Sequence, residues 1–180
     1  MDESTVEHSD SLSRDSGHFE PIKSGVISLF GRSNVGKSTL LNSIIGQKLS
    51  IVSDKPQTTR TRILGVKNYT AGQIVFADTP GVHKPSHRLN VRMVKAAFSA
   101  IRNIDLLALV VDASRNKELE DQTVLRKLET VDVPVFLILN KVDLIKKPSL
   151  LPIIDRYRKA YDFSEYVPVS AIDGFNLDLL

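Results

Sequence analysis

The chain has 180 residues, of which 42% are hydrophobic, 25% charged and 6% aromatic, with no cysteine and no tryptophan. This length suits one globular domain with a tail, and the composition excludes a wholly disordered or fibrous chain. The absence of cysteine excludes a disulfide scaffold, a cysteine-based zinc site and a thiol nucleophile, and it fits a reducing cytoplasm. No apolar run approaches the roughly 18–20 residues that span a bilayer, and the polar, acidic N-terminus is not a secretory signal peptide.

The net charge of +3 is unevenly distributed. Residues 1–20 hold six acidic side chains against Arg14, a balance of −5, whereas residues 21–180 hold 23 basic and 15 acidic side chains, a balance of +8. A basic body favours phosphate-bearing partners, but ordinary solvated surface charge is the simpler interpretation. We expect residues 1–24 to be a disordered acidic tail and residues 25–180 to be the folded domain.

Hydrophobic periodicity predicts a series of alternating elements along the chain. It predicts a buried strand at 26–30, a helix at 37–45 ended by Gly46, a polar loop at 47–61, and paired strands at 62–69 and 73–77. A loop follows, then a helix at 89–102, a strand at 106–111, a helix at 118–131, a strand at 135–139, a helix at 149–161, a strand at 166–169 and the opening of a helix at 175–180. This alternation indicates a doubly wound α/β sheet.

The strongest motif is GRSNVGKS at residues 31–38, which satisfies GxxxxGK[ST] between a predicted strand and a predicted helix. Glycines let consecutive backbone N–H groups and the helix N-terminus point at phosphate oxygens. Lys37 would place a cation against the β- and γ-phosphates, and the hydroxyl of Ser38 is a candidate Mg²⁺ ligand. The alternative is a glycine-rich turn with an exposed lysine. The expected nucleotide contacts here are Asn34, Val35, Gly36, Lys37, Ser38 and Thr39.

A second motif, Asp-Thr-Pro-Gly, begins at Asp78 after the third predicted strand. A carboxylate there can hold Mg²⁺ through water, because this ion keeps part of its hydration shell. The N–H of Gly81 would face the γ-phosphate and sense its presence. On its own the motif is weak, because Pro-Gly is a common turn pair.

A third motif, Asn140-Lys141-x-Asp143, follows the strand at 135–139 and gives a reason to choose guanine. The two oxygens of the Asp143 carboxylate match the paired N1–H and N2–H₂ donors of guanine. Adenine has no such donor pair and would leave the carboxylate buried and unpaired. The aliphatic stem of Lys141 would cover the plane of the base. The alternative is a turn ended by a helix-capping aspartate.

Ser170-Ala171, after the last predicted strand, is the weakest of the four motifs because so short a pair recurs by chance. It would bring a backbone N–H to the guanine O6. All four motifs lie at predicted carboxyl ends of strands, where open α/β sheets bind ligands. This joint placement is more specific than any single match.

The arrangement resembles the translation-associated GTPases of the Ras-like P-loop class and, within them, the Era family of bacterial ribosome-assembly GTPases. The resemblance rests on residues 34–42, on SDKPQTTRTR at 53–62 and on DTPGVHKP at 78–85, and it covers roughly residues 24–180. It implies a P-loop NTPase fold, a three-layer sandwich with a mostly parallel six-stranded sheet. It also implies a molecular switch that binds and hydrolyses GTP with slow intrinsic turnover.

The resemblance adds further residue roles to those that the motifs suggest. Thr59, or alternatively Thr58, would be the switch threonine that meets Mg²⁺ and the γ-phosphate. Asn34 resembles the loop asparagine of potassium-stimulated GTPases, which adds K⁺ to GTP/GDP and Mg²⁺ as an implied ligand. Val82 stands where Ras-like enzymes have a catalytic glutamine, and an aliphatic side chain cannot orient water. The implied catalytic residues are Asn34, Lys37, Thr59 and Gly81, the implied metal ligands are Ser38, Thr59 and Asp78, and residues 47–61 and 79–90 are the implied switches.

Ser33 departs from the family, which more often has proline there, without removing a phosphate donor. Family members also carry a KH-type RNA-binding domain, and no pair of the nine glycines has the Gly-x-x-Gly spacing that such a domain uses. We therefore expect that domain to be absent from this chain and residues 25–180 to be a GTPase domain that stops inside its last helix. The resemblance implies the small ribosomal subunit and its 16S rRNA as partners, mainly through the missing domain, and a cytoplasmic location. Peripheral association with the inner membrane is left open.

Two other functions remain open at this point. A P-loop ATPase or small-molecule kinase shares residues 31–38, but Asn140-Lys141-x-Asp143 argues against it. A nucleotide-bound interaction module with negligible turnover is suggested by Val82. Nucleotide titration separates the first from a GTPase, and a single-turnover assay separates the second.

Overall fold

A computed structural model describes residues 23–47, 63–78, 104–115, 125, 128–129 and 131–180. The strands within these ranges are β1 (Lys23–Phe30), β2 (Ile63–Tyr69), β3 (Gly72–Asp78), β4 (Leu106–Asp112), β5 (Val135–Asn140) and β6 (Glu165–Pro168). The α-helices there are α1 (Lys37–Ile45) and α4 (Leu150–Ala160), and the 3-10 turns are η1 (Val142–Leu144), η2 (Lys147–Ser149) and η3 (Leu177–Leu179).

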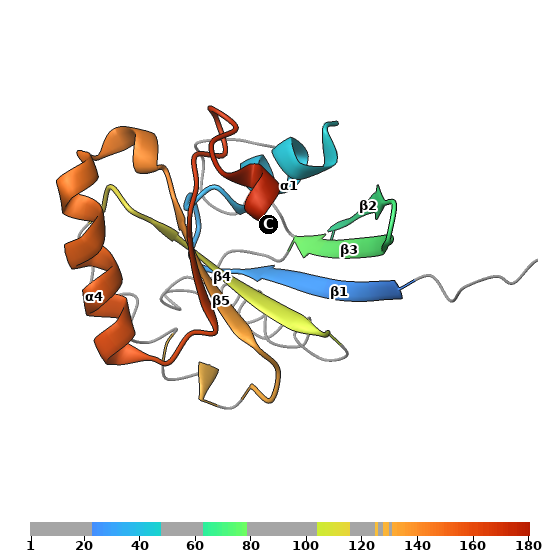
Figure 1. Cartoon of the computed structure of the whole chain (residues 1–180), viewed down its shortest axis with the longest axis horizontal. Helices are drawn as coiled ribbons and strands as arrows, with labels where there is room; N and C mark the ends of the chain where they lie inside the picture. The colour runs from blue at the N-terminus through green and yellow to red at the C-terminus, as the bar shows by residue number, and fades with distance from the viewer. Residues whose placement is uncertain (1–22, 48–62, 79–103, 116–124, 126–127, 130) are drawn as a thin grey trace, which may run out of the picture.

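The strands form one sheet in the order β2-β3-β1-β4-β5-β6 (Figure 1). Only β2 runs antiparallel to its neighbour, β3, and the remaining pairs are parallel. β2 and β3 are separated by residues 70–71, and so short a connection permits only antiparallel pairing. The predicted six-stranded, mostly parallel sheet is confirmed.

The central strand β4 shows why the sheet is covered on both faces. Leu107, Leu109 and Val111 belong to one buried cluster, whereas Ala108 and Val110 belong to a second. Successive side chains of a strand point to opposite faces, so an unbroken apolar run needs a hydrophobic layer on each side.

One helix of the described chain packs on each cluster. α1 contributes Leu40, Leu41, Ile44 and Ile45 to the second cluster, at the spacing that the sequence predicts. α4 contributes Tyr157 to the first cluster, with Ile153 and Ile154 packed against it. The two helices lie apart in Figure 1, α4 at the left and α1 at the upper right. The predicted three-layer α/β sandwich is confirmed.

Three boundaries differ from those predicted. β1 begins at Lys23 rather than Val26, because Lys23 pairs with Gly72 of β3 despite its polar side chain, so residues 23–24 are strand and not tail. Asn140 ends β5 instead of following it, and it pairs in register with Asp112. Residues 175–180 contain the 3-10 turn η3 where an α-helix was expected, and the helical residues begin at Leu177 rather than 175, because Asn176 has a left-handed φ of 57° and stands as the N-cap.

Some expected elements lie outside the described residues. They are nearly all of the loop at 47–61, the helix at 89–102 and most of the helix at 118–131. Of the last range, Leu125 and Leu128 are described, and both are buried in the first cluster. Within the described ranges, no helix is long and apolar enough to span a membrane.

Candidate nucleotide-binding site

The four sequence motifs gather at one edge of the sheet. The parallel strands β3, β1, β5 and β6 all end at this edge, since parallel neighbours share a direction. Residues 31–38, named the phosphate loop from here on, follow β1, and Asp78 ends β3. Asn140 ends β5, and Ser170 lies shortly after β6. Ligands of open α/β sheets bind at this edge, so the expected clustering is confirmed for the described residues.

The phosphate loop is built from backbone conformations that favour glycine. Its φ angles are 145° at Gly31, 62° at Asn34 and 98° at Gly36. A side chain at Gly31 would also collide with β4, since its Cβ would lie 2.3 Å from the carbonyl oxygen of Val110. Left-handed residues curl successive N–H groups into a concave anion-binding surface, and the glycine N-cap of α1 places no side chain over the first helical turn.

Lys37 is buried within the phosphate loop. Lys37 is only 6% exposed, and its Nζ donates hydrogen bonds to the carbonyl oxygens of Gly31 at 3.2 Å and Arg32 at 2.8 Å. The alternative reading of this motif, a turn with an exposed lysine, is therefore wrong. A buried ammonium group held by carbonyl oxygens presents positive charge inside the loop, where an anion would meet it.

Asn140 joins the phosphate loop to the loop after β6. It is 1% exposed, its Nδ2 donates to the carbonyl oxygen of Val35 at 2.9 Å, and its Oδ1 accepts from the N–H of Ala171 at 3.1 Å. The sequence placed Asn140 in a motif without this bridging role. The N–H of Ala171, which we expected to face a base oxygen, is engaged by Asn140 in this structure.

Lys141 makes a second connection to the phosphate loop. Its Nζ donates to the carbonyl oxygen of Asn34 at 2.7 Å and to Oδ2 of Asp112, the last residue of β4, at 2.7 Å. Asp112 is in none of the four motifs. An acidic residue closing the buried run at 106–111 was the signal that could have revealed it, because this run ends at the same sheet edge.

The carboxyl group of Asp112 is held in its ionised form. Burial alone would raise its pKa, but hydrogen bonds from Lys141 and Ser114, with the positive charge of Lys141, outweigh burial and lower the pKa below its usual value. Asp112 and Lys141 therefore face each other as an ion pair at neutral pH.

Ser43 of α1 holds the other side of the Ala171 peptide. Its Oγ donates to the carbonyl oxygen of Ala171 at 2.6 Å, so this peptide is bonded through its N–H to Asn140 and through its C=O to Ser43. No pattern in the sequence points to this contact, because it joins residues 128 positions apart, one in α1 and one in the loop after β6.

Replacing Ser43 by alanine should loosen this loop with little change in overall stability. The lost hydrogen bond is worth about 1 kcal/mol, and the higher helix propensity of alanine offsets about half of it. We expect the amides of residues 170–175 to exchange with deuterium roughly fivefold faster, as measured by hydrogen-exchange mass spectrometry. Ser43→Thr keeps the hydroxyl and should exchange like the wild type. Unchanged exchange in Ser43→Ala would show that the contact does not hold the loop.

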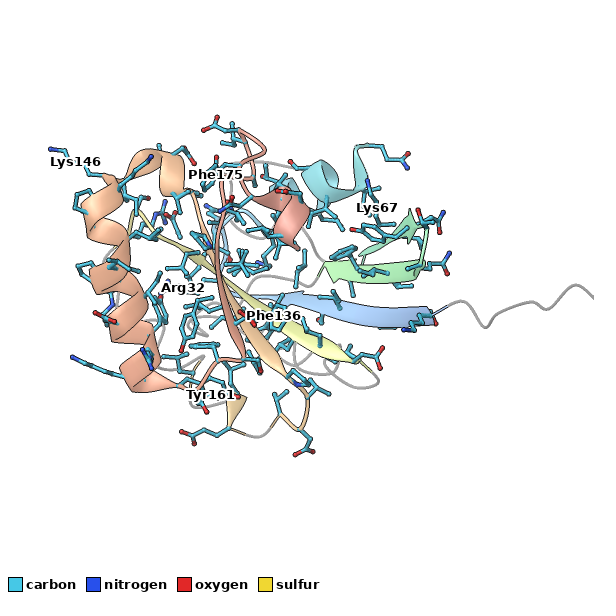
Figure 2. All side chains as sticks on the ribbon, viewed as in Figure 1. Arg32, Lys67, Phe136, Lys146, Tyr161 and Phe175 are labelled. Atoms are coloured by element: carbon cyan, nitrogen blue, oxygen red, sulfur yellow. The ribbon has the colours of Figure 1, made fainter. Side chains whose placement is uncertain are left out.

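Asp143 lies at the wall of a pocket of about 610 Å³. The pocket brings it together with Ser170, and its other lining residues are Val142, Ile145, Lys147, Leu150, Pro168, Asp173, Gly174 and Phe175. Figure 2 labels the exposed Phe175 on the loop after β6. Asp143 is exposed. An exposed carboxylate is hydrated, so it becomes unpaired only when a base that lacks the matching donors covers it. Selectivity between bases would therefore arise when the base binds.

The expected metal ligands are described only in part. Ser38 lies in the first turn of α1, and the backbone of Asp78 pairs with Leu29 of β1, two residues before the phosphate loop. A hydroxyl and a carboxylate are oxygen donors of the kind that Mg²⁺ prefers, so the donor chemistry fits this ion. Thr58, Thr59, Gly81 and Val82, with residues 79–90, lie outside the described residues. Within the described ranges, no three His, Cys, Asp or Glu side chains group as a metal site.

Comparison with known proteins agrees with this geometry. Residues 26–141 match the family described as 50S ribosome-binding GTPase. The chain is 49% identical over 160 residues to GTPase Era of Geobacter metallireducens, an alignment that covers 89% of this chain and 54% of that protein. The chain thus spans about half the length of the curated relative it matches.

Two solved structures of Era superpose closely on the chain. One, of Era in complex with MgGDPNP and nucleotides 1506–1542 of 16S ribosomal RNA, has a TM-score of 0.83 and 38% identity, covering 88% of this chain and 55% of that chain. The other, a variant of Aquifex aeolicus Era bound to GDP and AlF4⁻, has a TM-score of 0.81 and 37% identity, with the same two coverages. The phosphate loop, the sheet order and these matches together show that the chain belongs to the 50S ribosome-binding GTPase family and is a homologue of Era over about half of Era's length.

Proposed function

We propose that this chain binds guanine nucleotides and hydrolyses GTP as a molecular switch of the Era type. The observation that carries the proposal is the bridge at Asn140, which ties the phosphate loop to the loop after β6 through Val35 and Ala171. One rigid side chain thereby sets the spacing between a phosphate-binding surface and a base-reading surface. This spacing is what a nucleotide, with its phosphates and base at opposite ends, requires.

The phosphates would occupy the concave side of the phosphate loop. Its backbone N–H groups and the N-terminus of α1 supply donors, and Lys37 supplies the positive charge. The expected contacts remain Asn34, Val35, Gly36, Lys37, Ser38 and Thr39. In this proposal Lys37 exchanges a carbonyl partner for a phosphate oxygen, which is a stronger, charge-assisted hydrogen bond.

The base would lie against Asp143 and Lys141. The exposed carboxylate of Asp143 accepts from the two donors of guanine, and the stem of Lys141, whose ammonium group is fixed on Asn34, covers the ring. Ser170 and Ala171 close the site beside them. Because the N–H of Ala171 bonds Asn140, it reaches a base oxygen by sharing its hydrogen atom between the two acceptors.

Hydrolysis follows from positioning and charge stabilisation. Water attacks the γ-phosphorus in line as its bond to the β,γ-bridging oxygen breaks, which releases GDP and inorganic phosphate, while Lys37 and the loop N–H groups stabilise the charge on the oxygens. Ser38, Thr59 and Asp78 would hold Mg²⁺, which neutralises phosphate charge when bound. Asn34 would sit beside a K⁺ ion, and Gly81 would meet the γ-phosphate. Val82 cannot orient water, so we propose slow intrinsic turnover.

The partners of this chain are proposed from its relatives. The Era structure that superposes best among those described above holds a fragment of 16S ribosomal RNA. We propose that this protein likewise acts on the small ribosomal subunit in the cytoplasm, and that RNA contacts come mainly from the KH-type domain that family members carry.

Calorimetric titration with GDP and with ADP tests the proposal. We expect GDP to bind at least about 100-fold more tightly, because the site is built around the guanine donors. Comparable affinities would overturn guanine selectivity and favour an ATPase or kinase.

A single-turnover GTP assay in KCl and in NaCl buffers then tests hydrolysis. We expect slow turnover that is faster in KCl. Equal rates in the two salts would remove the K⁺ site, and the absence of turnover would leave a nucleotide-bound interaction module.

A further inference from the structure

Asp112 is a buried carboxylate that none of the proposed nucleotide contacts uses. It ends β4, its side chain is 4% exposed, and it stands opposite Asn140 in the pairing of β4 with β5. An ionised carboxylate at such a depth is unfavourable unless its oxygens are paired. Its partners therefore indicate why it is there.

Both carboxylate oxygens of Asp112 have partners. Oδ1 accepts from the backbone N–H of Ser114 at 3.0 Å and from its hydroxyl at 2.5 Å. Oδ2 faces Nζ of Lys141 at 2.7 Å and Nε of Arg115 at 3.3 Å. The Arg115 side chain is 51% exposed, whereas that of Lys141 is 23% exposed. Ser114 thus fixes the orientation of the carboxylate, and the less solvated ion pair is the one with Lys141.

Lys141 transmits this orientation to the phosphate loop. The same Nζ that meets Asp112 donates to the carbonyl oxygen of Asn34 at 2.7 Å. Lys141 and Asn34 both have left-handed backbones, with φ of 65° and 62°, conformations that need support from their surroundings. Asp112, Lys141 and Asn34 therefore form a continuous polar connection from the end of β4 to the phosphate loop.

We propose that Asp112 is a positioning residue for guanine-nucleotide binding. It anchors the ammonium group of Lys141, so that the stem of Lys141 lies ready for the base and the phosphate loop is held in its binding conformation before a ligand arrives. This inference rests on the proposed function. Preorganisation of this kind lowers the ordering cost of binding, so its loss raises the dissociation constant.

The competing explanation is that Asp112 only stabilises the end of β4. Its bonds to Ser114 and Arg115 are local and would serve that purpose without any link to the site. The two explanations differ in one respect: a positioning role acts through Lys141, whereas a purely structural role does not.

A double-mutant cycle on GDP binding distinguishes them. Asp112→Asn keeps the shape and the acceptor for Ser114 but removes the charge that faces Lys141. We expect it to bind a fluorescent GDP analogue about tenfold more weakly than the wild type, mainly through faster dissociation. In a Lys141→Met background the same change should alter binding less than about twofold, because the group it positions is gone.

Two further variants keep the test decisive. Arg115→Ala removes the exposed partner of the same carboxylate and should change binding less than about twofold. Ser114→Ala frees Oδ1 from the hydroxyl while leaving the charge intact, and it should weaken binding about threefold, which supplies a measurement if Asp112→Asn does not fold. Urea unfolding without nucleotide reports the stability of each variant separately.

The outcomes separate the inference from the proposed function. Failure of the wild type to bind GDP would refute the function itself. Normal binding by the wild type with an equal loss from Asp112→Asn in both backgrounds, or with no loss in either, would overturn the positioning role of Asp112 alone.

Discussion

Replacement of Gly36 by alanine is expected to weaken GDP binding more than about 100-fold and to lower the free energy of unfolding by about 2–4 kcal/mol. Gly36 has a φ of 98° at the N-cap of α1, a conformation that costs an L-residue about 1–3 kcal/mol. Strain alone would leave the loop in place. The larger effect comes from what the new methyl group would meet.

The methyl group would be placed on the side chain that bridges the site. A Cβ at Gly36 would lie 2.3 Å from Nδ2 of Asn140, the atom that donates to Val35. Because Asn140 is 1% exposed and bonded on both sides, it has no free direction in which to move. Either the phosphate loop must move away from Asn140, or the hydrogen bonds of Asn140 must break. Both changes would alter the spacing between the phosphate loop and the loop after β6.

Gly46→Ala is a matched control for this prediction. Gly46 is the C-cap of the same helix with a φ of 79°, but a Cβ there would meet nothing within 4 Å. It should lose about 1 kcal/mol of stability from backbone strain and keep its affinity for GDP. Calorimetry and urea unfolding of both variants give the comparison. If the two variants lost affinity equally, left-handed strain rather than the contact with Asn140 would be the cause.

The parts of the fold that depend on neighbouring residues were predictable. The apolar run at 106–111 is typical of a strand covered on both faces, and the spacing of Leu40, Leu41, Ile44 and Ile45 is typical of a helix buried along one side. Gly46 ends that helix as expected, donating its N–H to Asn42. The phosphate loop was equally predictable, since its glycines and its lysine lie within eight consecutive residues.

The contacts that make these parts into one site were not predictable. Three hydrogen bonds join residues that are far apart in the sequence. Their separations are 105 positions for Asn140 and Val35, 29 for Lys141 and Asp112, and 128 for Ser43 and Ala171. Each exists because the sheet order β2-β3-β1-β4-β5-β6 brings the ends of strands that are distant in sequence to one edge, and no local periodicity encodes that order.

Replacement of Asn140 by alanine should lower the free energy of unfolding by about 3–5 kcal/mol, a large part of the stability of a domain of this size. Two hydrogen bonds are lost, and the carbonyl of Val35 and the N–H of Ala171 are left without a partner in a buried position. A buried polar group without a partner costs about 1–3 kcal/mol, so the unpaired groups contribute more than the lost bonds. Urea unfolding in the absence of nucleotide measures the change without involving any ligand.

Asn68→Ala is the appropriate comparison, because it removes the same amide group from the exposed strand β2, where the side-chain oxygen accepts one bond from Gln73. Its effect should stay within about 0.5 kcal/mol, since water replaces the lost partner. A loss below about 1 kcal/mol for Asn140→Ala would mean that the two loops find other partners or water and that Asn140 does not hold them together. A loss near 4 kcal/mol, together with a large loss of GDP affinity, would show that both the folding of this sheet edge and nucleotide binding depend on Asn140.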